Sequence, residues 1–302
     1  MKLTNIVDIV KMAQENQKKR LVVVYVNDSH TVEAVNDAVD AGIVDATLTG
    51  DKSKIASLCQ ELNIDINKFE VIDQADPIEA GLVCCDLINQ DKAHLIMKGT
   101  ITSDDYMRCI LNKERGIMEK GSLLTHVTVV EPNGYGKIMI VGDVAVIPAP
   151  NVDQKEKILS YLIKTAHKLG NENPKVALIS ASEKVNKKIA SSADAFELTE
   201  RAKQGVFKQS VICGPMGLDL AIDEEAVKIK GYKSEVAGNA DIILFPNIES
   251  GNVFYKTCTK FLKSDLAALV VGAKVPAVLS SRGDSPKTKL YSIALAAITT
   301  DK

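Results

Sequence analysis

Residues 281–285, Ser-Arg-Gly-Asp-Ser, have the residue types best suited to hold an anion in this 302-residue chain. They follow a short apolar run and precede a helical pattern. Apolar residues at spacings of three and four carry that pattern: Leu290, Ile293, Ala294 and Ala297. Ser285 is a favoured N-cap and Pro286 a favoured first helical residue, so a helix is predicted to begin here. N–H groups at a helix start attract anions, and the guanidinium of Arg282 offers a fork of donors that fits phosphate. An ordinary strand-to-helix turn with a surface arginine is the alternative interpretation.

A second candidate site lies at residues 98–103, Lys-Gly-Thr-Ile-Thr-Ser, between a predicted strand and a predicted helix. Lys98 supplies positive charge, Gly99 allows the backbone to approach a ligand closely, and Thr100 and Thr102 supply hydroxyls. In open parallel sheets, ligands bind at this carboxyl edge of the strands. The G-x-x-x-x-G-K spacing of a Walker A loop is absent, and a capped helix after a tight turn is the alternative.

Composition and charge restrict the class of protein. A net charge of −2 argues against a general nucleic-acid or membrane-surface binder, so local positive charge must hold any anionic substrate. No apolar run reaches about 18 residues, and the N-terminus lacks the apolar core of a signal peptide. We therefore expect a cytoplasmic protein with no membrane segment.

The cysteines give no sign of a metal or redox site. Six are present, and none has C-x-x-C or C-x-x-H spacing. We interpret the adjacent Cys84 and Cys85 as small, inert core residues.

Strands and helices alternate along nearly the whole chain, which predicts α/β layers with mostly parallel sheets. Pro-Asn-Gly at 132–134 separates two apolar runs and predicts a hairpin. The clearest break is the proline-containing segment 147–151. We place one domain at residues 1–146 plus 277–302, and a second, inserted domain at residues 147–276. Residues 246–252 are predicted to be a polar loop, with a helix from Val253.

Several segments resemble the phosphate acetyl/butyryltransferase family. They are K-G-T at 98–100, L-L-T-H-V at 123–127, G-P-M-G-L-D-L-A-I at 214–222, A-D-I-I-L-F-P-N-I-E-S-G-N at 240–252, V-V-G-A-K-V-P at 270–276 and S-R-G-D-S at 281–285. The resemblance runs from about residue 20 to the C-terminus. The chain length, L-L-T-H-V and the K-L-x-S-I-A-L-A ending look most like the butyryl branch.

The resemblance implies reversible acyl transfer, in which acyl-CoA and phosphate give acyl phosphate and CoA. It implies no metal and no tightly bound cofactor, since coenzyme A is a substrate. It also implies a two-domain α/β/α fold like that of isocitrate and isopropylmalate dehydrogenases, with the site in the cleft between domains. A homodimer or higher homo-oligomer, dimerising through the inserted domain, is expected, with no nucleic-acid or membrane partner.

The resemblance assigns catalytic roles to Ser281 and Arg282, which serve the phosphoryl end. In the acetyl branch an aspartate stands seven residues after the motif serine, but this chain has Thr288 there, which cannot act as a base. Asp284 is the nearest carboxylate and our substitute for the base, with deprotonation of the thiol by solvent as the alternative. The substrate-binding positions are expected to be Lys98, Gly99, Thr100, Thr102, His126, Asp143, Glu249, Gly283 and Ser285. We expect His126 to be a wall residue rather than a catalyst, because a lone histidine in an apolar strand is more often a hydrogen-bonded core residue.

Three alternative functions stay open at this stage. One is phosphate acetyltransfer within the same family. Another is a metal- and NAD-dependent hydroxy-acid dehydrogenase of the same fold, although neither G-x-G-x-x-G nor a suitable D-x-x-x-D is present. The third is a non-catalytic protein that binds CoA or acyl phosphate.

Overall fold

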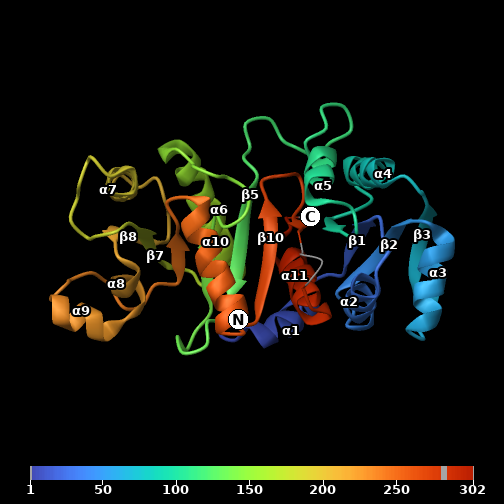
Figure 1. Cartoon of the computed structure of the whole chain (residues 1–302), viewed down its shortest axis with the longest axis horizontal. Helices are drawn as coiled ribbons and strands as arrows, with labels where there is room; N and C mark the ends of the chain where they lie inside the picture. Colours follow the sequence, from blue (N-terminus) through green and yellow to red (C-terminus); the bar gives the residue numbers. More distant parts are fainter. Residues whose placement is uncertain (1, 280–283, 302) are drawn as a thin grey trace. The chain divides into compact units, whose positions relative to one another are not determined.

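The computed structural model describes residues 2–279 and 284–301, and the chain forms two compact units (Figure 1). Unit 1 comprises Met1–Ile6 and Thr125–Leu266, and unit 2 comprises Val7–Leu124 and Ala267–Lys302. Each unit has a mostly parallel sheet with helical crossovers, which confirms the fold class predicted from the alternating pattern.

The unit boundaries differ from the domain limits placed at 146/147 and 276/277. The hairpin before residue 147 belongs to unit 1, because its second strand, β6, pairs with β9 of that unit. Strand β10 belongs to unit 2, because it pairs with β11, which in turn pairs with β4. Strand pairing therefore decides the boundaries, and the prolines at 148 and 150 lie inside unit 1.

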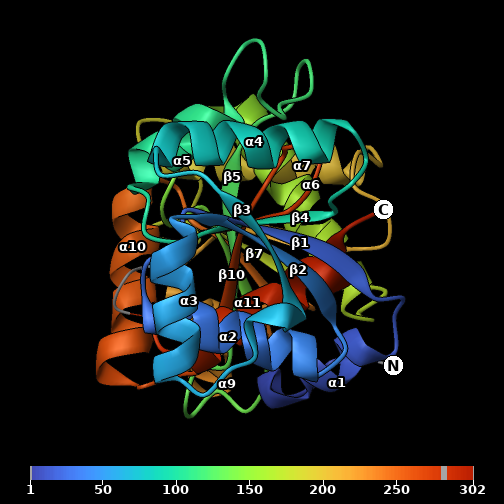
Figure 2. The same cartoon turned by 90° about the vertical axis from the view of Figure 1, so that its right-hand side faces the viewer.

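Unit 2 contains a sheet in the order β3-β2-β1-β4-β11-β10, in which β10 runs antiparallel to β11. Its elements are η1 (Ile6–Asp8, which begins at the last residue of unit 1), α1 (Ile9–Gln14), β1 (Lys19–Val24), α2 (Ser29–Asp40), β2 (Val44–Gly50), α3 (Lys52–Glu61), η2 (Ile66–Lys68), β3 (Phe69–Asp73), α4 (Pro77–Asn89), β4 (Leu95–Lys98), α5 (Ser103–Ile110), β10 (Leu266–Val271), β11 (Ala277–Val278) and α11 (Pro286–Thr299). Figure 2 shows α4 and α5 on one face of this sheet and α1, α2, α3 and α11 on the other.

Unit 1 contains a sheet in the order β5-β6-β9-β7-β8. Its elements are β5 (Thr125–Val130), β6 (Met139–Gly142), α6 (Val152–Lys168), β7 (Lys175–Ile179), α7 (Ala190–Lys203), β8 (Val211–Met216), α8 (Leu218–Ile222), α9 (Glu224–Lys230), β9 (Ile242–Leu244), α10 (Ile248–Lys256) and η3 (Thr257–Phe261). The predicted hairpin is confirmed, since β5 and β6 pair antiparallel. Helix α6 packs on β6 and β9, and α7 packs on β7 and β8.

Helix α11 confirms the predicted start after residue 285. Ser285 is the N-cap, its Oγ accepts the N–H of Thr288 at 3.2 Å, and Pro286 occupies the first turn. The apolar stripe is wider than expected, because every residue from 291 to 298 is buried. The helix lies against α2 and α1 on one side and β11 and β4 on the other, which explains why nearly its whole circumference is covered.

Helix α10 corrects the prediction of a loop over 246–252. Asn247 caps a helix that begins at Ile248, and its Oδ1 accepts the N–H of Ser250 at 3.0 Å. Gly251 lies in the first turn of this helix, where a glycine is required. A Cβ would overlap the carbonyl oxygen of Asp143, against which the helix packs.

The buried core confirms the interpretation of the adjacent cysteines, since Cys84 and Cys85 are 0% exposed. No helix among the residues that the structure describes is long and apolar enough to cross a membrane.

Candidate active site

The topology of unit 2 has a switch point at the carboxyl ends of β1 and β4. These strands are neighbours and parallel, but the helices that follow them go to opposite faces. Helix α2 follows β1 and packs with α11, whereas α5 follows β4 and packs with α4 (Figure 2). Open α/β sheets generally bind ligands at such a switch point, so this edge is the candidate ligand site. The strand that leads to residues 280–285, β11, is the other neighbour of β4 and ends at the same edge.

The Lys-Gly-Thr loop at this edge is held tightly against the end of β1. The N–H of Gly99 donates to Val24 and the N–H of Thr100 donates to Tyr25, both at 2.9 Å. A Cβ on Gly99 would lie 2.6 Å from the carbonyl oxygens of both Val24 and Tyr25, so only glycine fits. Both N–H groups therefore already have acceptors at the end of β1 in this structure.

The side chains of this loop also serve its own geometry. Lys98 is 3% exposed, and its Nζ donates to the carbonyl oxygens of Gly99 (3.1 Å) and Ile101 (3.2 Å). The hydroxyl of Thr100 donates to the Tyr25 carbonyl at 2.9 Å. Thr102 is the N-cap of α5. The side chains of Lys98, Thr100 and Thr102 therefore hold the conformation of this loop at the carboxyl end of β4.

The anion motif itself is described only in part. Ser281, Arg282 and Gly283 lie outside the described residues, so their predicted roles stay predictions. Asp284 is half-buried, and Ser285 is exposed at the start of α11. The Oγ of Ser285 lies 3.1 Å from the hydroxyl of Thr288, so both side chains are engaged in the helix cap.

In unit 1, the candidate residues Asp143 and His126 lie opposite each other at the same end of β5 and β6. Asp143 is 3% exposed, and its carboxylate accepts the Thr125 hydroxyl at 2.8 Å and the His126 N–H at 3.3 Å. It also accepts three N–H groups of the following loop, at residues 145, 146 and 147. With five donors directed at it, the Asp143 carboxylate fixes the loop after β6.

His126 is buried on the same edge. It is 4% exposed, its Nδ1 lies 3.2 Å from the Thr128 hydroxyl, and its ring meets that of Tyr255 edge-on, with centroids 6.4 Å apart. These contacts show that His126 is a buried, hydrogen-bonded residue, and its role in lining a substrate site stays a prediction. Glu249, by contrast, is exposed in the first turn of α10. The neighbouring Asn252 fixes that turn by donating to the Val144 carbonyl at 3.2 Å.

One charged residue of unit 2 was missed from the sequence. Lys289, in the first turn of α11, is 2% exposed. Its spacing from Ile293 and Ala296 places it on a buried face of the helix, and that spacing was the available signal. Burial lowers the pKa of Lys289, while the nearby Asp28 and Asp284 act in the opposite direction.

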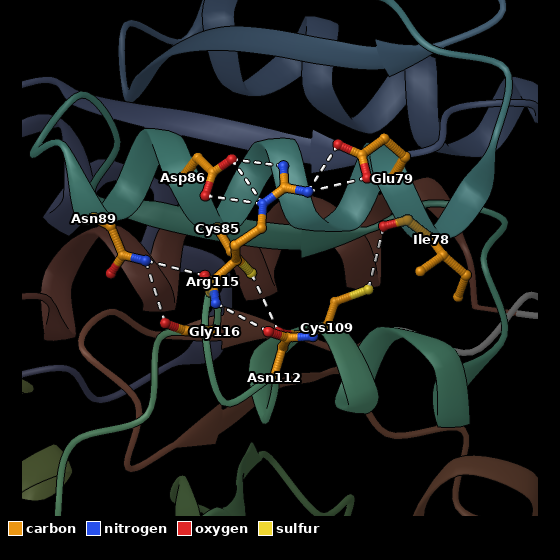
Figure 3. A network of polar contacts seen from close by, with 9 residues as sticks. All are labelled: Ile78, Glu79, Cys85, Asp86, Asn89, Cys109, Asn112, Arg115 and Gly116. Atoms are coloured by element: carbon orange, nitrogen blue, oxygen red, sulfur yellow. Dashed lines mark hydrogen bonds and ion pairs between the residues drawn. The ribbon is translucent and has the colours of Figure 1, made fainter.

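A network around Arg115 fixes the segment that follows α5 (Figure 3). The guanidinium donates to both oxygens of Glu79 (2.9 and 3.0 Å) and to Asp86, the shortest contact being 2.6 Å. Asn89 donates to the Arg115 carbonyl at 3.0 Å, and the Oδ1 of Asn112 accepts the Arg115 N–H at 2.9 Å. The segment after α5 is thereby tied to α4.

Cysteines beneath this network are unsuited to nucleophilic or redox chemistry. Burial raises the pKa of Cys85 to about 12 and that of Cys109 to about 11. Thiols with such pKa values are protonated and inert near neutral pH. In residues 2–279 and 284–301, moreover, no three His, Cys, Asp or Glu side chains gather where they could hold a metal ion.

With the geometry in view, the chain can be compared with known proteins. The family model described as "Phosphate acetyl/butaryl transferase" matches residues 5–81 and 79–297. The chain therefore belongs to this family and is an acyltransferase.

Particular relatives agree with this family assignment. Phosphate butyryltransferase of Clostridium acetobutylicum is 40% identical over 291 residues, which cover 96% of each chain. Phosphate acetyltransferase of Thermotoga maritima is 35% identical over 290 residues, which cover 96% of this chain and 98% of that one. The crystal structure of a branched-chain phosphotransacylase from Enterococcus faecalis V583 matches with a TM-score of 0.83 and 28% identity, covering 93% of this chain and 98% of that one.

Proposed function

We propose that this enzyme transfers a short acyl group reversibly between CoA and inorganic phosphate, with butyryl as the favoured group. The observation that carries the proposal is the 40% identity to a phosphate butyryltransferase across 96% of both chains. The switch point of unit 2 supports it, because β4, which leads into the Lys98 loop, and β11, which precedes α11, are parallel neighbours that end at one sheet edge.

The reaction proceeds by direct attack in a ternary complex. A phosphate oxygen attacks the thioester carbonyl, a tetrahedral oxyanion forms, and the C–S bond breaks to release the CoA thiolate. Arg282 holds the phosphate through two parallel hydrogen bonds, and Ser281 donates to the oxygen on which charge develops. Both roles are carried over from the family resemblance.

The loops at the sheet edges supply a fixed frame for this chemistry. Preorganised groups stabilise a transition state because they need no rearrangement when charge develops. Lys98 contributes a buried amino group at the end of β4. Thr100, Thr102, Gly99 and Ser285 are the other substrate-binding positions proposed for this edge, and the role of Gly283 is carried over from the family resemblance. The proposed wall residues of unit 1, His126 and Asp143, are likewise fixed by hydrogen bonds. Glu249, at an exposed position, completes the set.

In the reverse direction, the CoA thiol must lose its proton as it attacks the acyl phosphate. Asp284 is our candidate base, since Thr288 stands where the acetyl branch has an aspartate. Deprotonation by solvent is the alternative, because a thiol has a pKa near 8.5. No metal and no tightly bound cofactor enters this scheme.

The acetyl group is the second candidate substrate. The 35% identity to a phosphate acetyltransferase over nearly the same length favours keeping it open. A pocket that excludes one methylene changes selectivity only about 10- to 200-fold, so chain-length preference depends on few contacts. Family membership argues against the dehydrogenase alternative.

The test is phosphate-dependent release of free thiol from acetyl-, propionyl-, butyryl-, isobutyryl- and valeryl-CoA. We expect release to need phosphate and to be fastest with four-carbon chains. Fast release from acetyl-CoA alone would keep the family and change the substrate. No release from any of them by a folded sample would leave a non-catalytic binder and overturn the proposal.

We also propose that the enzyme works in the cytoplasm as a homodimer or higher homo-oligomer. The free state of the six cysteines supports a reducing compartment. The oligomer is carried over from the family resemblance, and light scattering of the purified chain would measure it directly.

A further inference from the structure

Tyr25, the residue that follows β1, has a backbone conformation that an aromatic residue rarely adopts. Its φ is 53°, in the left-handed region, where the Cβ of an L-residue crowds the following carbonyl oxygen. Glycine adopts this region without that crowding. The chain therefore keeps an aromatic side chain at a position where glycine would be free of strain.

The other residues with positive φ that are not glycine have an ordinary explanation. In the described part of the chain they are Asn63, Asp91, Gln209 and Lys263, and all four are polar and exposed. Three of them directly follow the C-cap of a helix, a position where a left-handed residue commonly ends the helix. Tyr25 is aromatic and half-buried, and it follows a strand, so this explanation does not account for it.

Main-chain hydrogen bonds on both sides hold Tyr25 in this conformation. Its N–H donates to the Thr49 hydroxyl at 3.1 Å, near the end of β2. Its carbonyl oxygen accepts the N–H and the hydroxyl of Thr100, both at 2.9 Å. All of these bonds use the backbone of residue 25, so glycine could make them as well. They fix the place from which the side chain extends, but they do not require a tyrosine.

The hydroxyl of Tyr25 makes no hydrogen bond within residues 2–279 and 284–301. Tyr106 and Tyr135 differ, because their hydroxyls donate to the carbonyl oxygens of Ile96 at 3.2 Å and Ala240 at 2.8 Å. Tyrosine hydroxyls usually find such a partner when the ring is buried inside the protein. Strained residues cluster at ligand-binding sites, so a ligand is the candidate partner of this side chain.

The place of Tyr25 in the sheet indicates which part of the substrate it meets. Only β4 separates its strand, β1, from β11, and the three strands run parallel and end at the switch-point edge. Neighbouring strands lie about 4.8 Å apart, so the ends of β1 and β11 are about 10 Å apart. Strand β11 leads to the S-R-G-D-S motif, where the proposed function brings phosphate to the thioester carbonyl. An acyl chain starts at that carbonyl and can extend toward the end of β1, whereas the adenine lies at the far end of CoA.

We propose that Tyr25 is a specificity-determining residue, whose ring packs against the acyl chain of the substrate and favours four-carbon over two-carbon groups. The inference rests on the proposed function and names a contact that sets its chain-length preference. Each methylene covered by the ring is removed from water, which favours the longer chain. The strained backbone is the cost of holding an aromatic side chain at this edge.

The test compares kcat/KM for butyryl-CoA with kcat/KM for acetyl-CoA in phosphate-dependent thiol release. Tyr25→Gly suits the left-handed backbone and removes the ring, so the butyryl-to-acetyl ratio should fall about tenfold, the lower end of the effect of one methylene. The ratio does not depend on the fraction of protein that is active, so a loss of stability alone leaves it unchanged. Tyr25→Phe keeps the ring and should keep the wild-type ratio.

Two further variants complete the comparison. Asn63→Gly relieves backbone strain of the same kind at the exposed end of α3, so it should leave the ratio unchanged. Tyr25→Asn lacks the ring, and asparagine tolerates the left-handed region. It should therefore show the same fall as Tyr25→Gly, and it decides the question if Tyr25→Gly does not fold.

A fall in each ring-free variant that folds, with wild-type ratios in Tyr25→Phe and Asn63→Gly, supports the proposal. An unchanged ratio in a folded ring-free variant overturns it and makes Tyr25 structural. An equal fall in Tyr25→Phe or Asn63→Gly also overturns it, because the ring is still present in both. Failure of the proposed function is distinct, because the wild-type enzyme would then release thiol from neither substrate when phosphate is present.

Discussion

Arg282 is the residue on which the proposed phosphate binding depends most, because a bound phosphate needs a fixed positive charge with directed donors. Arg282→Ala should lower turnover by about two orders of magnitude or more, the scale of removing a preorganised donor. Arg282→Lys is the matched control and should recover only part of the rate, since an ammonium lacks the guanidinium fork. Phosphate-dependent thiol release measures both variants, and an unchanged rate in folded Arg282→Ala would contradict the assignment.

The proposed role of Asp284 as a base predicts an effect that depends on pH, because a base is needed only while the thiol is protonated. Asp284→Asn should lose rate at low pH in the direction that consumes CoA. Its rate should approach that of the wild type as pH rises toward the thiol pKa, near 8.5. Profiles of the variant and the parent that stay parallel across the whole pH range would show that solvent removes the proton instead.

At the scale of elements, Asp241 joins the starts of the neighbouring strands of unit 1. Its carboxylate accepts the Lys137 ammonium at 2.8 Å before β6 and the N–H of Lys175 at 2.8 Å on β7. Burial by itself raises the pKa of Asp241, but these bonds outweigh it and the pKa lies below its ordinary value. The ionised form is therefore more favourable in the folded chain than in the unfolded one.

The sign of this effect fixes its pH dependence. A depressed carboxyl pKa stabilises the fold above the unfolded value, near 3.9, and the contribution is lost as pH falls through the folded pKa. Asp241→Asn should lower the free energy of unfolding by about 2 kcal/mol near pH 7, the scale of hydrogen bonds to a charged group. Denaturant unfolding should show this difference constant above pH ~5 and shrinking below pH ~4. A difference that persists at pH 3 would assign the loss to packing.

How far the sequence could predict an element depended on whether local residues decide its geometry. The start of α11 was predictable, because Ser285 and Pro286 are local signals that the structure uses. The start of α10 was not, because Gly251 is required by the backbone of Asp143, more than a hundred residues earlier. The hydrogen bonds of the Gly99 and Thr100 N–H groups could not be predicted either, because their acceptors lie at the end of β1, distant in sequence.

At the scale of the whole molecule, the alternating pattern predicted the fold class but not the boundaries between units. Alternation reports the order of elements, whereas the boundaries depend on which strands pair, and β6 pairs with β9 a hundred residues away. The burial of Lys289 could not be predicted from the sequence for a related reason. Its compensating carboxylate Asp28 is distant in sequence and is brought near by the packing of α2 on α11.

Measuring the binding of CoA separately from turnover distinguishes an enzyme from a protein that only binds CoA. A ligand that binds only the native state stabilises it by about 2.7 kcal/mol at one hundred times its Kd. CoA should therefore raise the unfolding temperature of the wild type, and Asp284→Asn should show the same rise, because removing a base leaves binding of the substrate intact. Thermal unfolding with and without CoA, run beside the thiol assay, gives the comparison. Equal stabilisation combined with a pH-dependent loss of rate in the variant identifies an acyltransferase that uses Asp284. Equal stabilisation with no turnover in either protein identifies a binder, and loss of stabilisation in the variant would place Asp284 in CoA recognition instead.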